Sequence, residues 1–303
     1  MSIVINTNIG ALNAGASLSA NASTLTQAMQ RLSTGSKLNS AADNAAGSAI
    51  STRMTAQLNG YTQATQNTND AISLVQTAAN DMGNIVGYLQ KIRELAVQSA
   101  SGTNSASDKA SLNAEAQQML KEVDRVAGSA MFNNISLLNG SSAGTYADGT
   151  TYSGMQITVQ VGANATANDQ ITIDIANTEA SNLGVGTSSV SGATTTGALS
   201  SIDLTQAGGT SGGESAIDVI DVAIQQVSDA QAELGAVQNR LSSTVNYLSS
   251  NQTNLSAAQS RVADTDYSQE TTKLSRAQII QQAATAMLAQ ANQQPQSVLA
   301  LLK

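Results

Sequence analysis

Apolar side chains recur with a period of about 3.5 residues in the first third of the chain. Alternate steps of four and three residues from Met54 to Ala96 meet mostly apolar positions, and Ile85 and Ile92 lie beside them. The positions are Met54, Leu58, Tyr61, Thr65, Thr68, Ile72, Val75, Ala79, Met82, Val86, Leu89, Arg93 and Ala96. A seam of this length predicts a coiled-coil helix, which we place at residues 44–101.

The same spacing recurs between Ile220 and Val262, near the other end of the chain. It predicts a second long helix at residues 213–263, and two helices of similar length are natural partners. Glutamine interrupts this otherwise aliphatic seam at Gln231, Gln238, Gln252 and Gln259.

Capping signals accompany the predicted helices. Ser105 stands three residues before Asp108, which is the spacing of a capping box, and we expect a shorter helix at residues 107–127. Ser40 and Asp43 have the same spacing just before the first long helix, so they are expected to mark its start.

The apolar period changes to two in the middle of the chain. Residues 155–161 and 171–175 alternate apolar with polar side chains, which predicts the two strands of a hairpin. Residues 185–213 are rich in Ser, Thr and Gly and indicate exposed loop. The fold class is therefore mainly α, with long coiled-coil helices in an elongated domain and β-hairpins in the middle segment.

Both ends of the chain have helical apolar stripes but no charge. Residues 1–30 contain no Asp, Glu, Lys or Arg, and neither do residues 277–302. A solvated surface helix normally has a charged outer face. The ends could be ordinary core helices, but the absence of charge favours helices that are buried between subunits. The stripes consist of Leu18, Ala22, Leu25, Met29 and Leu32, and of Ile280, Ala284, Met287, Leu288 and Ala291.

The composition excludes most catalytic chemistry. The 303 residues include no His and no Cys, so the commonest general base, the commonest zinc ligand and all thiol chemistry are absent. No pair of carboxylates or Ser-x-x-Lys cluster accompanies a Gly-rich segment. We expect no catalytic residue, no metal site and no cofactor.

Charge limits the classes of partner. The net charge of −8 argues against nucleic acid, which requires a basic surface. Residues 126–239 contain ten acidic side chains and no Lys or Arg, which indicates a solvent-facing segment. No stretch approaches the roughly 18 apolar residues of a membrane span. The amino end lacks the basic and apolar regions of a cleavable secretory signal.

Several motifs resemble those of bacterial flagellins. At the amino end they occupy residues 5–8, 30–35, 37–43, 45–47, 92–100 and 122–126, with Phe132 and Asn133 after them. At the carboxyl end they occupy residues 260–267, 275–283 and 287–299. Together the matching regions cover about residues 1–140 and 213–303, and the strand pair resembles a hairpin of the same family. The outer domains of larger members have little counterpart here.

The resemblance implies a structural subunit that assembles into the extracellular helical filament used for bacterial motility. It implies export as an unfolded chain through the flagellar type III apparatus. The implied partners are further copies of the chain, an export chaperone at the carboxyl end, and the filament cap and hook–filament junction proteins. A hook–filament junction protein is the alternative identity within the same structure.

The resemblance also divides the chain into five segments. They are an amino-terminal inner-core helix and linker at 1–43, two helices and the start of a hairpin at 44–140, a hairpin and variable outward-facing segment at 141–212, the second long helix at 213–263, and a carboxyl-terminal inner-core helix at 264–303. The expected intersubunit core consists of Ile3, Ile5, Ile9, Leu18, Leu25, Met29, Leu32, Ile279, Ile280, Met287, Leu288, Val298, Leu299 and Leu302.

A second implied partner is the vertebrate Toll-like receptor 5. Arg93, Leu95 and Glu115 resemble residues that this receptor contacts in the family. Lys91 stands where many recognised flagellins have Arg, and lysine lacks the bidentate fork of arginine. The alternative is that Arg93 and Glu115 form an ordinary solvated pair beside Leu95.

Overall fold

The structure is a computed structural model of the chain, and it describes residues 7–140, 144–145, 151–152, 154–184, 186–187, 194–195, 198–206 and 216–301. The chain forms two compact units. The terminal unit consists of Met1–Leu58 and Thr253–Lys303, and the central unit consists of Asn59–Gln252. The boundaries between them fall inside long helices, and the five segments predicted from the sequence stay predictions.

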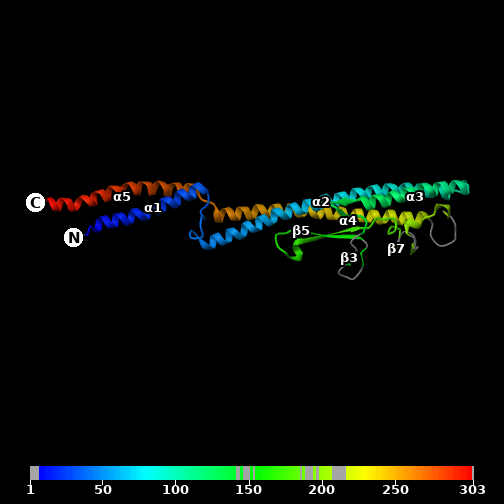
Figure 1. Cartoon of the computed structure of the whole chain (residues 1–303), viewed down its shortest axis with the longest axis horizontal. Coiled ribbons are helices and arrows are strands. Elements are labelled where there is room, and N and C mark those ends of the chain that lie inside the picture. The colour runs from blue at the N-terminus through cyan, green and yellow to red at the C-terminus, as the bar shows by residue number, and fades with distance from the viewer. Residues whose placement is uncertain are drawn as a thin grey trace. The chain divides into compact units, whose positions relative to one another are not determined.

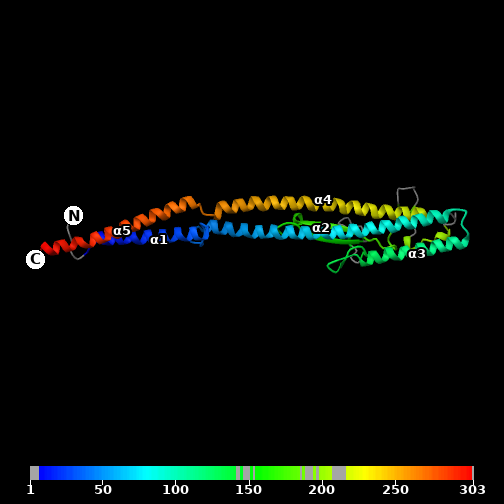
Figure 2. The ribbon, with the colours of Figure 1, turned by 90° about the horizontal axis from the view of Figure 1, so that it is seen from above.

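An antiparallel pair of helices forms most of the terminal unit. The helices are α1, Ile9–Thr34, and α5, Tyr267–Leu301. They lie side by side in both views (Figures 1 and 2). Asn8 Nδ2 donates to the Ala291 carbonyl oxygen at 2.8 Å, and Asn21 Nδ2 donates to that of Ala277 at 2.7 Å. The partner number falls as the residue number rises, so the two helices run in opposite directions.

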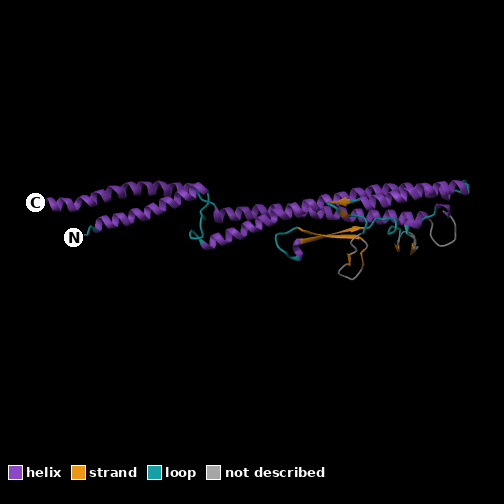
Figure 3. Ribbon diagram, in the orientation of Figure 1, coloured by secondary structure: helices purple, strands orange, loops and turns teal. Residues whose placement is uncertain are grey.

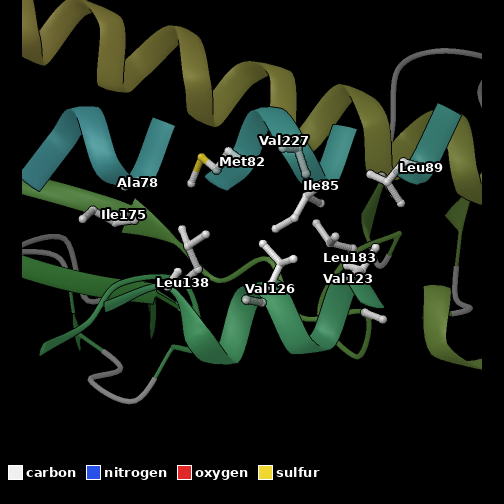
Figure 4. Packing of buried hydrophobic residues seen from close by; sticks show 14 of the residues in the cluster. Ala78, Met82, Ile85, Leu89, Val123, Val126, Leu138, Ile175, Leu183 and Val227 are labelled. Atoms are coloured by element: carbon white, nitrogen blue, oxygen red, sulfur yellow. The ribbon is translucent and has the colours of Figure 1, made fainter. Parts of the chain in front are cut away.

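Three helices supply the framework of the central unit. They are α2, Ala45–Ala100, α3, Ala106–Ser129, and α4, Ala216–Ala263. Met82 and Ile85 of α2 and Val123 of α3 are fully buried, and Figure 4 shows Ile85, Val126 and Leu138 pointing toward one another. Each fully buried aliphatic side chain stabilises the fold by about 1.5–3 kcal/mol. The three predicted helices are therefore confirmed, with a shared aliphatic core.

One hairpin completes this core. Strands β5, Gly154–Gln160, and β6, Gln170–Ala176, pair antiparallel from Gly154 opposite Ala176 to Gln160 opposite Gln170. Ile171, Ile173 and Ile175 alternate with polar residues and are buried, which confirms the predicted hairpin (Figure 3). The shorter pairs are β1, Met131–Phe132, with β2, Ile135–Ser136; β3, Gly144–Thr145, with β4, Thr151–Tyr152; and β7, Gly186–Thr187, with β8, Thr194–Thr195.

Helix α2 buries a stripe that differs from the predicted seam at every second position. The predicted positions Thr68, Val75, Met82, Leu89 and Ala96 are fully buried. From Met54 onward, the other buried positions of α2 are Ala64, Ala71, Leu74, Ala78, Ile85, Ile92, Leu95 and Ser99. By contrast, Ile72, Ala79 and Val86 of the predicted seam are only partly buried, and Arg93 is exposed. The predicted seam is wrong there because the helix also packs against α3 and the hairpin, which lie on the side of Ile85 (Figure 4).

Three of the four glutamines in the α4 seam form hydrogen bonds with α2. In the central unit, Gln231 Nε2 donates to the Ala79 carbonyl oxygen at 3.3 Å, and Gln252 Nε2 donates to Thr62 Oγ1 at 3.0 Å. Leu234, Leu241 and Leu248 lie between these glutamines in the sequence and are buried, as predicted. The bonds set an antiparallel register for the two helices.

The helix starts follow one of the two predicted capping signals. Asp108 N donates to Ser105 Oγ at 3.2 Å while Ser105 N donates to Asp108 Oδ2 at 2.9 Å, which confirms the capping box of α3. Ser40 and Asp43 instead form a turn before α2. The cap of α2 is Asn44, whose Oδ1 accepts from Gly47 N at 2.9 Å. Ser40 and Asp43 therefore lie just before the helix but do not cap it: the cap is four residues after Ser40, because the Asp43 carboxylate accepts its bonds within the turn.

Candidate assembly surface

The face that α1 and α5 bury against each other uses small side chains. Ala28 and Ala277 are almost fully buried, and Asn21 is buried between the same helices. The larger residues Leu18, Leu25, Leu32 and Leu288 are only half-buried. The contact between the two helices is therefore made largely by small side chains, and the bulky leucines remain partly exposed to solvent.

Large apolar side chains also stand on the outside of this pair. The residues are Ile9, Leu12, Met29, Ile279, Ile280 and Met287, each between 43% and 66% exposed. Single exposed apolar residues are normal, but a group of them on two paired helices is typical of an interaction surface. No charged residue occurs from Ile9 to Gln30 or from Ala277 to Leu301 that could solvate it. We call the six residues the terminal apolar set.

The predicted intersubunit residues divide according to this geometry. Ile9, Met29, Ile279, Ile280 and Met287 are exposed, whereas Leu18, Leu25, Leu32 and Leu288 contribute to the helix pair itself. Ile3, Ile5 and Leu302 lie outside the described residues. Val298 and Leu299 belong to α5, but their side chains are not described. Sequence reasoning missed Leu12. Its helical spacing of three residues from Ile9 could have indicated that the two side chains lie on the same face of α1.

The charges of α1 and α5 gather where these helices meet their linkers. The guanidinium of Arg31 lies 3.5 Å from Asp43 Oδ1 and 3.8 Å from Glu270 Oε1, and Lys273 Nζ lies 3.0 Å from Glu270 Oε2. The Glu270 side chain is only 7% exposed. A buried carboxylate needs such partners because its desolvation is costly. We call Arg31, Asp43, Glu270 and Lys273 the linker charge cluster.

The two linkers of the terminal unit bond directly to each other. Lys37 N donates to the Ala263 carbonyl oxygen at 2.8 Å, and Thr265 N donates to that of Gly35 at 2.9 Å. Gly35 has a φ of 70°, a left-handed conformation that favours glycine. A Cβ at this position would also meet Tyr267 Oη at 3.3 Å. The linkers from α1 to α2 and from α4 to α5 are thus joined side by side.

Hydrogen bonds hold Asp43 in its ionised form. Gln27 Nε2 donates to Asp43 Oδ1 at 2.7 Å, and the backbone of Ser40 donates to Oδ2 at 2.9 Å. These bonds, the one from Gln27 first, lower the pKa of Asp43 below its ordinary value. The linker turn is therefore stabilised by a carboxylate and not by a neutral carboxyl group.

The predicted receptor residues do not form a single exposed patch. Lys91 and Glu115 are exposed, but Leu95 is only 3% exposed and belongs to the core of the central unit. Arg93 pairs with Asp221, with Nη2 3.1 Å from Oδ2, so the alternative interpretation, a pair of Arg93 with Glu115, is wrong. The bonds to Asp221 raise the pKa of Arg93, and a bond to Glu94 raises that of Lys91. Sequence reasoning missed Asp221 because it lies 128 residues away.

The described part of the chain shows no other chemical centre. Among the described residues, no three of His, Cys, Asp and Glu gather closely enough to hold a metal ion. No helix within the same ranges has the length and hydropathy needed to cross a membrane.

Comparisons with known proteins agree with these features. The family model for the bacterial flagellin N-terminal helical region matches residues 5–143, and the model for the bacterial flagellin C-terminal helical region matches residues 217–302. Flagellins of Bacillus subtilis and Halalkalibacterium halodurans are 41% and 39% identical to this chain; the first match covers 99% of both chains, and the second covers 99% of this chain and all of that relative.

A third relative is the flagellar filament 33 kDa core protein of Treponema phagedenis, which is 36% identical over 99% of this chain and all of its own length. The family models together match more than half of the chain, and these relatives match it almost from end to end. The chain belongs to the bacterial flagellins, which are structural subunits of the flagellar filament and not enzymes.

Proposed function

We propose that copies of this chain join through the terminal apolar set on α1 and α5. Its flagellin relatives imply a filament of many copies located outside the cell. The single observation that supports this assignment is the exposure of large apolar side chains on the uncharged stretches of two helices, residues 9–30 of α1 and 277–301 of α5. Packing them against neighbouring copies would remove this apolar area from water, which favours association.

Two double variants of α5 test the proposal. Ile279→Ser with Met287→Ser removes two exposed apolar side chains, and Gln282→Ser with Gln290→Ser removes two exposed polar ones from the same helix. Each fully buried apolar side chain contributes about 1.5–3 kcal/mol, and about 1.4 kcal/mol is a factor of ten in an association constant.

The measurement is the critical concentration for seeded growth of filaments. We expect the apolar double variant to raise it at least about tenfold and the polar double variant to change it less than about twofold. Far-UV circular dichroism should report the same helix content for both, because all four positions are exposed. Equal critical concentrations for the two variants would remove the terminal apolar set from the assembly contact.

We further propose that an export chaperone covers α5 before assembly, and that cap and junction proteins contact the same filament. The exposed residues Ile279, Ile280 and Met287 support a chaperone role, since they would otherwise be free to associate inside the cell. Hydrogen exchange of the monomer with and without the chaperone should show added protection in α5. Protection confined to α2 would contradict this assignment.

Recognition by Toll-like receptor 5 is proposed for the exposed residues Lys91, Arg93 and Glu115. Leu95 would support this surface from within the core. Because arginine can form a bidentate contact that lysine cannot, Lys91→Arg should increase signalling in receptor-reporter cells. Lys121→Arg, at an exposed position of α3, is the control. A decrease or no change with Lys91→Arg would argue against a contact at this position.

A further inference from the structure

The central unit contains a polar pocket that the terminal apolar set does not involve. It has a volume of about 240 Å³ and lies among α2, α4 and the turn that joins β5 to β6. Its polar lining consists mainly of Tyr61, Asn164, Asn168, Arg240, Thr244 and Tyr247. Leu248 and Val161 also line it and are almost fully buried. The pocket is therefore a small hollow with an apolar floor and a rim of hydrogen-bonding groups.

Arg240 carries the positive charge of this pocket and forms no ion pair among the described residues, although the carboxylate of Asp169 lines the same pocket. No carboxylate oxygen of the described residues lies within 4.0 Å of its guanidinium. It is the only Lys or Arg between Arg125 and Arg261 in the sequence. Arg93 and Arg125 of the same unit have carboxylate partners, whereas Lys121 resembles Arg240 in forming no ion pair among the described residues. The guanidinium is thus available to an anion from outside the chain.

The acidic residue of the pocket is engaged in its own turn. Thr166 Oγ1 donates to Asp169 Oδ2 at 2.9 Å, and Val161 N donates to the Asp169 carbonyl oxygen at 2.8 Å. These bonds hold Asp169 in the turn that follows β5, while Arg240 belongs to α4. The turn shapes one wall of the pocket and leaves the arginine side open to a ligand.

We propose that this pocket binds the carboxylate side chain of an Asp or Glu from a second copy of the chain. A guanidinium forms two parallel hydrogen bonds with a carboxylate, and the hydroxyl groups of Tyr61 and Tyr247 can donate further ones. The volume suits one protruding side chain better than a drug-sized molecule, whose pockets are usually about 300–1,000 Å³.

Charge complementarity identifies the occupant. Each copy has 21 acidic and 13 basic residues, so a neighbouring copy presents mainly carboxylates to an unpaired cation. The inference rests on the proposed function, because a second copy is held against this pocket only within a polymer. It goes beyond the terminal apolar set by giving the central unit a polar contact that selects orientation.

Three variants test the charge. Arg240→Gln removes it, Arg240→Lys keeps it without the bidentate fork, and Lys121→Gln removes an exposed charge from the same unit without touching the pocket. We expect Arg240→Gln to raise the critical concentration of filament growth about three- to tenfold, with partial recovery in Arg240→Lys. Lys121→Gln should behave like the wild type. Thermal unfolding should be unchanged in all three monomers, because both positions are exposed.

A cross-linking experiment identifies the occupant directly. Tyr247 is 65% exposed, so Tyr247→p-benzoylphenylalanine places a photoreactive group at the pocket rim without disturbing the core. Filaments grown from a mixture of isotopically labelled and unlabelled chains should give cross-links between copies, in peptides that contain Asp or Glu. Cross-links within one copy only would overturn the inference.

The outcomes separate this inference from the proposed function. If the wild type polymerises and Arg240→Gln polymerises equally well, the pocket contact is wrong and the terminal apolar set is unaffected. If Arg240→Gln weakens assembly and the apolar double variant does not, the pocket contact stands while the terminal apolar set fails. If the wild type forms no filament, both fail together.

Discussion

Single residues decide how the linkers of the terminal unit are held. Asp43 accepts hydrogen bonds from Gln27 and from the backbone of Asn39 and Ser40. Its lowered pKa means that the folded turn favours the ionised carboxylate. A group of this kind contributes stability at pH values above its ordinary pKa, and the contribution is lost as pH falls through the lowered value. The turn should therefore loosen in acid.

Asp43→Asn should reproduce this loosening at neutral pH. The neutral amide cannot match the charge-assisted bonds, so we expect faster amide exchange at Asn39 and Ser40 near pH 7. The difference between variant and wild type should shrink as pH falls below the ordinary Asp pKa of about 3.9 and through the lowered pKa that Asp43 has in the folded turn. Asp70→Asn, at an exposed position of α2, is the control. A difference that persists undiminished in acid would contradict this role.

At this scale the sequence could predict the type of residue but not its partner. The spacing of Ser105 and Asp108 was sufficient for a cap because both groups lie within one turn. Ser40 and Asp43 have the same spacing, yet Gln27 and Arg31 of α1 draw Asp43 into a different role. Such long-range competition leaves no trace in local spacing.

Among the elements, the pairing of α2 with α4 depends on a narrow aliphatic seam. Leu241 is fully buried there. Leu241→Asp would place an uncompensated charge in this seam and should reduce the free energy of unfolding by about 3–5 kcal/mol. Ser242→Asp, at the next and exposed position, is the matched control. Thermal unfolding measures the stability of both variants. Equal unfolding midpoints for Leu241→Asp and Ser242→Asp would show that burial of Leu241 does not stabilise the pairing of α2 with α4.

The glutamines offer a second prediction for the same helix pair. Gln252→Leu removes the bond to Thr62 but adds apolar volume at a partly exposed position. We expect little change in stability, within about 1 kcal/mol, because a hydrogen bond and a modest apolar gain have similar magnitudes. Loss of the hydrogen bond to Thr62 should instead make the register of α4 against α2 less specific. Paramagnetic distance measurements between labels on α2 and α4 should then broaden, and unchanged distributions would contradict a register role.

Helix lengths were predictable because the period of 3.5 residues persists over many turns. The exact buried stripe of α2 was not, since Ala64, Ala71 and Ala78 give a weak apolar signal beside Ile72 and Val86. Which of these neighbours is covered depends on where α3 and the β5–β6 hairpin pack. That information belongs to tertiary structure.

For the whole molecule, the carboxyl end offers the clearest test of assembly. Deletion of residues 296–303 removes Val298, Leu299, Leu301 and Leu302. We expect a folded monomer that no longer polymerises, because the proposed assembly would bury these aliphatic residues against neighbouring copies, and each fully buried one contributes about 1.5–3 kcal/mol. Seeded growth should fail at concentrations where the full chain grows, with most of the far-UV helix signal retained. Normal growth of the truncated chain would contradict an assembly role.

The hydrogen bonds between α1 and α5 join residues that are very distant in the sequence. Asn8 and Ala291 are 283 positions apart, and Asn21 and Ala277 are 256 apart. Closing loops of this size carries a large entropic cost, and contacts of such separation form slowly. A chain that emerges from its amino end cannot complete the α1–α5 pair until almost the last residue is free. The order of synthesis therefore keeps α1 without its helical partner until α5 itself has been made.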